Sequence, residues 1–306
     1  MAEPDPVHPT LSDGVVSLRA LEAEALLHSF IVLAEDGPVG QLAIQELGDA
    51  VGQLTWATDQ SYQRRGFATR AVRLATDYAF GALRLDRVQA EVDARNHPAL
   101  RIAARAGLRR EGLLRGYRTI EGERHDRVLL ARLASDPGPE TQAGFIGLVN
   151  STLPRTRLIA HVVIRDNQGR IMLAETTYKT DWELPGGVVE TFESPREGAA
   201  RETWEELGIE LPIGKLLCVD WLPPWRGWDD AVELLFDGGI HGPELLSRLT
   251  LQPREIRRVE FCTLEQARER CLPGTHRRLV AVVGAPEGRV LYLERGAPPG
   301  STEPIF

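Results

Sequence analysis

The sequence predicts a protein of two α+β domains, each built around a mixed β-sheet. The chain has 306 residues, a length that fits about two domains. Residues 135–141 are rich in proline, glycine and acidic side chains, as in a linker. On both sides, segments with strand-like alternation are interspersed with segments of helical periodicity. We therefore expect a first domain over residues 1–135, a linker over 136–150 and a second domain over 151–306.

The bulk composition is ordinary for a globular protein, with 42% hydrophobic and 26% charged residues. The net charge of −8 argues against a broad nucleic-acid-binding surface. The three cysteines form no CxxC pair, so we expect reduced thiols in a cytoplasmic protein. The N-terminus lacks the apolar core of a signal peptide, and no apolar run suits a membrane helix. We expect a small-molecule partner, no membrane and no extended nucleic acid, and we leave a homodimer open.

Within the first domain, apolar alternation predicts strands around one strand–loop–helix unit. Residues 1–13 are expected to be a flexible lead-in, and residues 21–28 a short helix or turn. Asp36-Gly37 lies between two apolar runs and is a hairpin signal. The predicted strands cover residues 15–19, 29–35, 39–46, 51–58, 87–93, 109–117 and 126–133, and the predicted helices cover residues 63–83 and 98–107.

The second domain shows the same mixture of strands and helices. The turn at residues 166–169 separates two predicted strands. His161 lies inside the first of them, where a core histidine with a hydrogen-bond partner is expected. The predicted strands cover residues 158–165, 170–175, 216–221, 231–236 and 288–293, with another led into by residues 254–260 and a helix over 263–270.

The best-defined element is a helix from Pro195 to Leu207. Ser194 is a good N-cap, Pro195 suits the first helical position, and Glu197 completes a capping box. Gly208 stands where a helix ends in a left-handed turn.

Glu202, Glu205 and Glu206 lie three and four residues apart and therefore share one face of this helix. Like charges at this spacing repel one another, which indicates a hard cation such as Mg²⁺ among them. Arg201 is placed to pair with a carboxylate and fix its orientation. The alternative for three glutamates alone is a solvated helix rich in a good helix former.

The full spacing resembles the Nudix box. Gly187 is followed after five residues by Glu193, and then by Arg201-Glu202, Glu205-Glu206 and Gly208 at the family's spacing. Thr203 departs from the bulky apolar residue that is usual there. The resemblance implies a mixed-sheet α/β/α sandwich that hydrolyses a diphosphate bond in a nucleoside diphosphate linked to a group X, or in a nucleoside triphosphate.

The same resemblance implies a site built on Mg²⁺ or Mn²⁺. The implied metal ligands are Glu193, Glu202, Glu205 and Glu206, joined by a backbone carbonyl of Gly186 or Gly187. We expect Glu202 to be the general base, with Glu255 as a second candidate and Arg201 in the catalytic set.

In the first domain, the loop from Gln63 to Ala68 opens a helix and is a candidate phosphate site. Amides at a helix N-terminus attract phosphate, and Gly66 allows a ligand to approach closely. The alternative is a helix entry in which glycine serves a turn. The candidate residues are Gln63, Arg64, Arg65, Gly66, Phe67 and Ala68.

The first domain resembles a GNAT-family acetyltransferase over about residues 13–134. The resemblance rests on the Gln63–Ala68 loop, Asn96 after a strand and Ala106-Gly107-Leu108. It implies that acetyl-CoA binds with its pyrophosphate on this loop and with Asn96 near the pantetheine arm. The two helices that normally build the acceptor site have no room between residues 19 and 29. Glu46 and Tyr117 are the remaining acid/base candidates, or ordinary strand residues.

An aromatic loop from Trp221 to Trp228 is the candidate for substrate recognition, because tryptophan stacks well on bases. A hydrophobic cover or a dimer contact is the alternative. The substrate candidates are Tyr178, Trp182, Trp225 and Trp228, with Lys179 beside them.

Three functions follow as alternatives. The first is a Nudix hydrolase fused to an acetyl-CoA-binding domain. The second is a bifunctional protein, or mainly an N-acetyltransferase with a subordinate Nudix domain. The third is a nucleotide sensor that binds without turnover.

Overall fold

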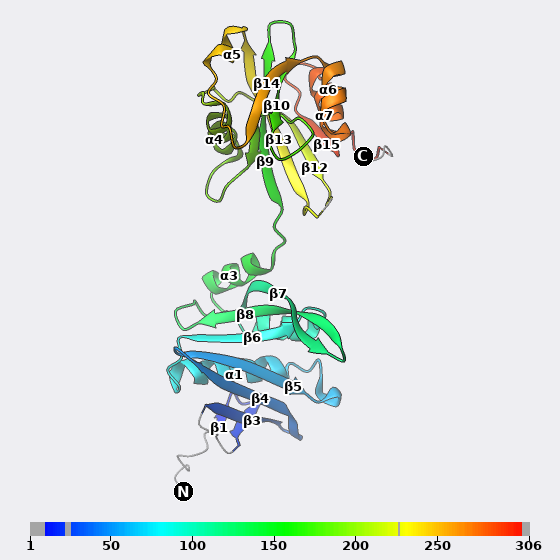
Figure 1. Cartoon of the computed structure of the whole chain (residues 1–306). Coiled ribbons are helices and arrows are strands. Elements are labelled where there is room, and N and C mark those ends of the chain that lie inside the picture. Colours follow the sequence, from blue (N-terminus) through cyan, green and yellow to red (C-terminus); the bar gives the residue numbers. More distant parts are fainter. Residues whose placement is uncertain (1–9, 22–25, 226, 302–306) are drawn as a thin grey trace, which may run out of the picture. The chain divides into compact units, whose positions relative to one another are not determined.

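The computed structural model describes residues 10–21, 26–225 and 227–301. They form two compact units, Met1–Pro154 and Arg155–Phe306, hereafter the first and second units (Figure 1). Each unit has its own sheet and core, which confirms the predicted two-domain α+β fold class. The exact limits of the domains stay a prediction.

The first unit is built on an eight-stranded sheet in the order β1-β2-β3-β4-β5-β6-β8-β7. The strands are β1 (Thr10–Ser12), β2 (Ser17–Ala20), β3 (Leu27–Ala34), β4 (Gly37–Gly48), β5 (Val51–Thr58), β6 (Arg87–Asp93), β7 (Arg109–Ile120) and β8 (Glu123–Leu133). The helices are the 3₁₀ turn η1 (Gln60–Tyr62), α1 (Phe67–Gly81), α2 (His97–Arg105) and α3 (Gln142–Thr152).

The centre of this sheet opens between β5 and β6. Their parallel pairing runs from Val51 opposite Arg87 to Gln53 opposite Gln89, and there it stops. The rest of β5 leads through η1 to the start of α1, whose apolar face packs on β4 and β5. The predicted phosphate loop therefore stands at the open end of a divided sheet.

Helix α3 overlaps most of the segment over residues 136–150 that the sequence suggested as a linker. Thr141 caps it by accepting a hydrogen bond from the amide of Gly144, and the amide of Arg110 donates to Ser151 Oγ. The helix packs on β7, so residues 142–152 are part of the first unit and do not form a tether. Composition alone missed this helix, because its apolar residues follow a proline- and glycine-rich run.

The second unit is a seven-stranded sheet in the order β14-β10-β9-β13-β12-β15, with β11 pairing to β9. The strands are β9 (Arg157–Asp166), β10 (Ile171–Thr176), β11 (Gly186–Val188), β12 (Leu216–Leu222), β13 (Ala231–His241), β14 (Ile256–Cys262) and β15 (Leu291–Glu294). The helices are α4 (Pro195–Leu207), α5 (Glu244–Arg248), α6 (Leu264–Arg270) and α7 (Pro273–Val283).

One apolar cluster lies on each face of this sheet. Ala160, Val162 and Ile164 of β9 pack with Ala199 and Leu207 of α4. On the other face, residues of β9, β12 and β15 pack with α6 and α7. Figure 1 shows α4 on one side of the sheet and α6 with α7 on the other, as in an α/β/α sandwich.

The predicted helix over Pro195–Leu207 is confirmed to the residue as α4. Ser194 and Glu197 form the capping box, and Gly208 ends the helix in the left-handed region at a φ of 68°. Thr203 is fully buried and donates its hydroxyl to the carbonyl of Ala199, so it keeps a partner inside the core.

Elsewhere the predictions and the structure differ in several elements. The hairpin at Asp36-Gly37 is confirmed between β3 and β4, whereas β7 and β8 extend further than predicted, to a turn at Glu121-Gly122. Strand β1 lies in the predicted lead-in, of which residues 1–9 lie outside the described residues. Residues 22–25 of the predicted helix or turn also lie outside, and β3 already begins at Leu27. The helices α5 and α7 and the short strand β11 were not predicted.

The cysteines and the helix lengths bear on two further expectations. Cys218, Cys262 and Cys271 are all buried and form no disulfide. Within the described ranges, no helix combines the length and the apolar character that a membrane crossing requires.

Candidate active site

Arg201 is the centre of an ion network at the start of the candidate site. Its guanidinium donates to both carboxylate oxygens of Glu193, at 2.8 and 3.2 Å, and to Glu202 and Glu205, each at 3.0 Å. It also donates to the carbonyl of Val188 at 3.1 Å. These carboxylates raise the pKa of Arg201 further above its already high ordinary value. Arg201 therefore ties the loop after β11 to the acidic face of α4.

The two glycines of β11 lie directly against the acidic face. A Cβ on Gly187 would stand 2.7 Å from Cδ of Glu202, so the glycine is what allows this carboxylate to reach the backbone. The amide of Gly186 donates to Oε2 of Glu206 at 2.9 Å. Gly186 has a φ of 131°, and a Cβ there would clash with the carbonyl of Ala160 at 2.2 Å. Close packing therefore requires glycine at both positions, and backbone conformation requires it at Gly186 as well.

Burial raises the pKa of two of the glutamates. Glu206 is 7% exposed, and burial together with the charges of Glu202 and Glu255 raises its pKa to about 7. The hydrogen bond from the amide of Gly186 lowers this pKa but does not cancel the rise. For Glu202, burial and the charges of Glu205 and Glu255 raise the pKa, and the pairing with Arg201 lowers it by less. Four carboxylates, those of Glu202, Glu205, Glu206 and Glu255, thus crowd a partly desolvated place.

Glu255 reaches this group from outside the box. It lies in the turn before β14, where its carbonyl accepts a hydrogen bond from the amide of Thr177 at 2.8 Å. Its carboxylate is near enough to raise the pKa of both Glu202 and Glu206. Tyr178 follows Thr177 and is 65% exposed, so its ring is accessible at the same edge. The structure therefore brings Glu255 and the box glutamates together.

The carboxylates of the box are suitable ligands for a hard divalent cation, although each already has a protein hydrogen-bond partner. Among the residues that the structure describes, no three His, Cys, Asp or Glu side chains already form a metal-binding group. Arg201 holds Glu193, Glu202 and Glu205, and the amide of Gly186 holds Glu206. Carboxylate oxygens are the ligands that Mg²⁺ and Mn²⁺ accept, and a cation would offset both the burial and the repulsion that raise the pKa values of Glu202 and Glu206.

Trp182 is not placed to stack on a substrate. The side chain is 6% exposed and belongs to the apolar cluster on the α7 face. The guanidinium groups of Arg258 and Arg270 lie over its ring at 4.9 and 4.5 Å from the centroid. The tertiary structure therefore uses this indole as a core residue with cation–π contacts.

The aromatic loop forms a tight turn between β12 and β13. Trp225 and Trp228 exchange two backbone hydrogen bonds of 3.0 and 2.8 Å, around Gly227 at a φ of 88°. The ring of Trp228 is 60% exposed, with the guanidinium of Arg157 5.0 Å from its centroid. Trp228 is thus an accessible stacking surface near the start of β9.

A second ion network, which the sequence analysis missed, lies inside the α7 face. Arg278 is 4% exposed and donates to Asp220 at 2.7 Å and to Glu233 at 2.8 Å. The Nδ1 of His161 lies 2.8 Å from the same oxygen of Glu233. His161 therefore has the hydrogen-bond partner expected of it. The available signal in the sequence was Asp220 and Glu233, each between two apolar residues of a predicted strand.

In the first unit, the phosphate loop has the backbone geometry of a tight helix entry. Arg64 and Gly66 both have positive φ, at 64° and 84°, and Gly66 is the N-cap of α1. Phe67 is buried, with the guanidinium of Arg65 4.8 Å above its ring. Beside the loop lies a pocket of about 280 Å³, lined by Asp13, Gly66, Thr69, Arg70, Arg73 and Arg105.

The other candidates of the first unit have structural partners. Asn96 caps α2, because its Oδ1 accepts a hydrogen bond from the amide of Ala99 at 3.1 Å. Glu46 pairs with His28 at 2.8 Å. Tyr117 donates its hydroxyl to Glu91 at 3.1 Å, and this hydrogen bond raises the pKa of Tyr117. Gln63 ends the 3₁₀ turn, with its amide donating to the carbonyl of Gln60.

The folds and the sites define a two-domain α+β protein with an acidic helix site in the second unit and a helix-entry loop in the first. Two family models match the chain, a NUDIX domain over residues 155–300 and an acetyltransferase (GNAT) domain over residues 6–109. The chain belongs to the Nudix family through its second unit, and residues 6–109 of its first unit are similar to the GNAT acetyltransferases.

Three curated relatives are similar to separate parts of the chain. A CTP pyrophosphohydrolase of Escherichia coli is 42% identical over 114 residues, 36% of this chain and 77% of the relative. A MutT-like protein of Streptomyces ambofaciens is 45% identical over 58 residues, 19% of this chain and 37% of the relative. An uncharacterized N-acetyltransferase p20 of Bacillus licheniformis is 29% identical over 116 residues, 37% of this chain and 65% of the relative. The chain thus spans less than two thirds of the last two relatives.

Proposed function

We propose that the second unit is a divalent-metal-dependent hydrolase that cleaves a diphosphate bond in a nucleoside diphosphate-X or a nucleoside triphosphate. The observation that carries this proposal is the acidic face of α4, where Glu202 and Glu206 lie against the β11 glycines with raised pKa values. The similarity to a CTP pyrophosphohydrolase supports a nucleotide substrate. The three free cysteines support a cytoplasmic setting.

The residues that would hold Mg²⁺ or Mn²⁺ are Glu202, Glu205 and Glu206, helped by Glu193 and by a carbonyl of Gly187. When bound, the metal supplies charge neutralisation on the diphosphate oxygens and lowers the pKa of water. Because Arg201 binds Glu193, Glu202 and Glu205, it keeps the carboxylates aligned.

Proton removal from the attacking water falls to Glu202 in this proposal. Its carboxylate lies against the β11 backbone, and burial raises its pKa toward the value at which a base is effective near neutral pH. Glu255 is the second candidate, since it shares the same electrostatic environment. Tyr178 and Trp228 are exposed aromatics for contact with the rest of the nucleotide.

A phosphate-release screen with Mg²⁺ across a panel of nucleotides tests this function. We expect Glu202→Gln to abolish turnover with little effect on folding, and Glu210→Gln, an exposed residue just after α4, to leave it unchanged. Turnover by Glu202→Gln at the wild-type rate would refute the assignment of the base. Binding of the nucleotide without turnover by the wild type would favour a sensor.

We also propose that the first unit binds acetyl-CoA or CoA. The divided sheet between β5 and β6, with a helix entry at its open end, favours this second function. The bound pyrophosphate would lie on the Gln63–Ala68 loop, where amides at the start of α1 point outward. Titration of the chain with CoA in a calorimeter tests the proposal. The absence of heat would leave the first unit a structural module.

A further inference from the structure

The buried network on the α7 face leads to the candidate active site on the other face of the sheet. Arg278 of α7 donates to Oε1 of Glu233 on β13, and the same oxygen lies 2.8 Å from Nδ1 of His161 on β9. His161 is directly opposite Gly186 in the pairing of β9 with β11. A Cβ on Gly186 would stand 2.9 Å from Cδ2 of His161, so the ring packs on this glycine.

Gly186 is the link to the acidic helix. Its amide donates to Oε2 of Glu206, whose buried carboxylate makes no other hydrogen bond within the described part of the chain. A rotation of the Gly186 peptide would break this hydrogen bond. A ring held firmly against Gly186 therefore restricts where the carboxylate of Glu206 points.

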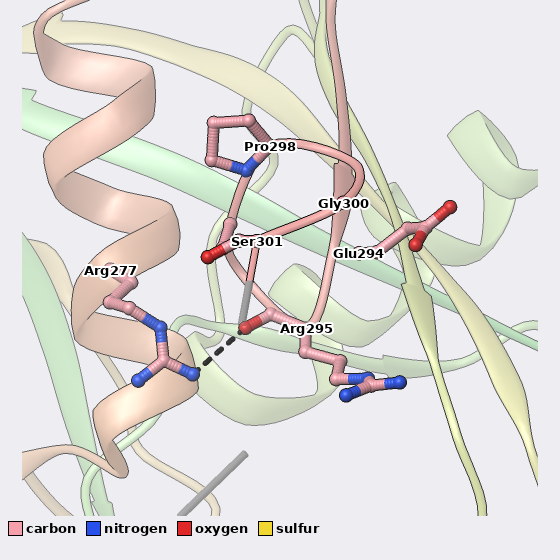
Figure 2. A pocket seen from close by; sticks show the side chains of 7 residues that line it. Arg277, Glu294, Arg295, Pro298, Gly300 and Ser301 are labelled. Carbon is pink, nitrogen blue, oxygen red and sulfur yellow. Dashed lines mark hydrogen bonds between the residues drawn. The ribbon is translucent and has the colours of Figure 1, made fainter. Parts of the chain in front are cut away.

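Asp220, at the end of the network away from Gly186, is held by two hydrogen bonds. Asp220 accepts from Arg278 and also from the amide of Gly296 at 2.9 Å, in the turn after β15. Next to Arg278 on the same helix, Arg277 donates to the carbonyl of Arg295 at 3.0 Å. Figure 2 shows this contact at the edge of a pocket of about 190 Å³. Arg277 therefore holds α7 to the turn after β15 directly, and Arg278 holds it there through Asp220.

Stability alone is a poor explanation for this arrangement. A buried ion network is often no more stable than apolar side chains of the same volume. Here Oδ1 of Asp220 is also buried without a hydrogen-bond partner among the described residues, which adds a desolvation cost. Orientation of neighbouring groups is the alternative role for such a network.

We propose that Glu233 and Arg278 are positioning residues, which act through His161 and Gly186 to orient the carboxylate of Glu206 for binding a divalent cation. This inference rests on the proposed hydrolase function. It assigns to the α7 face a role in a site that α4 carries on the opposite face. Partners of this kind change metal affinity or activity by about 10- to 100-fold when they are removed.

The test compares two variants of the full chain by metal binding and by amide exchange. The first, Asp220→Asn with Glu233→Met and Arg278→Met, replaces the whole network by neutral groups of similar size. The second, His161→Gln, removes the ring and leaves Glu233 paired with Arg278. The control, Arg165→Met with Asp237→Asn, removes a different ion pair between β9 and β13.

We expect both variants to bind Mn²⁺, measured by electron paramagnetic resonance, about 10- to 100-fold more weakly than the wild type. We also expect amide exchange in the 183–190 segment to accelerate at least about tenfold, as for loss of a local restraint. In turnover, kcat should fall while the nucleotide KM stays unchanged. The control should match the wild type in all three measurements.

Wild-type Mn²⁺ affinity and wild-type exchange in a folded triple variant would overturn the proposal. If the triple variant does not fold, the same result in His161→Gln overturns it. Mn²⁺ binding and amide exchange need no nucleotide substrate. If the wild type hydrolyses no nucleotide, the proposed function is refuted, and exchange at Gly186 still decides the positioning role.

Discussion

The carboxylate of Glu202 lies where a side chain of Gly187 would be, with Cδ 2.7 Å from an ideal Cβ. Gly187 has no left-handed φ, so its backbone tolerates alanine, and the clash falls on the end of a flexible side chain. We expect Gly187→Ala to displace Glu202 and to lower kcat about 10- to 100-fold. The unfolding free energy should change by less than about 1 kcal/mol.

The adjacent Gly186 provides the matched comparison. Its φ of 131° and the 2.2 Å approach to the carbonyl of Ala160 make alanine strained in both conformation and packing. Gly186→Ala should therefore destabilise the second unit by about 2–4 kcal/mol in urea denaturation. Equal stability losses in the two variants would contradict this distinction between a displaced side chain and a strained backbone.

Phe192 is a further place where backbone conformation predicts stability. It has a φ of 72° and a fully exposed side chain, in the loop between β11 and α4 that also carries Glu193. Glycine relieves the left-handed strain, partly offset by the entropy that it adds to the unfolded chain. We expect Phe192→Gly to stabilise the second unit by about 0.5–1 kcal/mol.

Phe192→Ala is the control, because it removes the ring and keeps the strain. Its unfolding free energy should stay within about 0.5 kcal/mol of the wild type. Should alanine stabilise as much as glycine, the cause would be the exposed ring and not the backbone.

Local signals predicted the elements that local interactions form. The capping box of Ser194 and Glu197 and the stop at Gly208 are short-range, so the sequence predicted both ends of α4. Strands β5 and β6 were predicted to the residue for the same reason, since their apolar alternation is regular.

Tertiary interactions decided the rest. Arg278 is charged, so nothing local indicates that α7 turns it inward, where two acidic strand residues receive it. Trp182 was expected at the substrate, but the arginines that cover its ring come from β14 and α6, far away in sequence. The glutamates of the box and the pairing of Arg201 with a carboxylate were predicted from the sequence, whereas the hydrogen bond between Gly186 and Glu206 depends on the folded β11 turn.

The different environments of two tryptophans give another prediction. Trp182 is buried between arginines, so Trp182→Ala should destabilise the second unit by about 3–5 kcal/mol. Trp182→Phe should keep the nucleotide KM. Trp228 is 60% exposed, and if it stacks on the base, Trp228→Ala should raise KM about 5- to 150-fold with little loss of stability. A KM that responds to Trp182→Phe and not to Trp228→Ala would reverse these roles.

The pKa of Glu206 makes the stability of the metal-free protein depend on pH. Burial raises this pKa from 4.5 to about 7, so between these values the folded state holds a proton that the unfolded state has lost. The folded state then binds more protons, and the unfolding free energy must fall as pH rises from about 4.5 to 7. The loss should reach at most about 3 kcal/mol, measured by urea denaturation in a chelator.

Glu206→Gln isolates this contribution, because its amide oxygen can still accept from Gly186 but carries no charge at any pH. The unfolding free energy of the wild type should therefore fall relative to that of the variant as pH rises through this window. Above about pH 8 the difference between the two proteins should stay constant. Mg²⁺ binds the ionised carboxylates, so at pH 7.5 it should restore stability to the wild type and less to the variant. Parallel pH curves for the two proteins would show that Glu206 ionises as an ordinary glutamate, and its buried place beside Gly186 would then need no cation to compensate its charge.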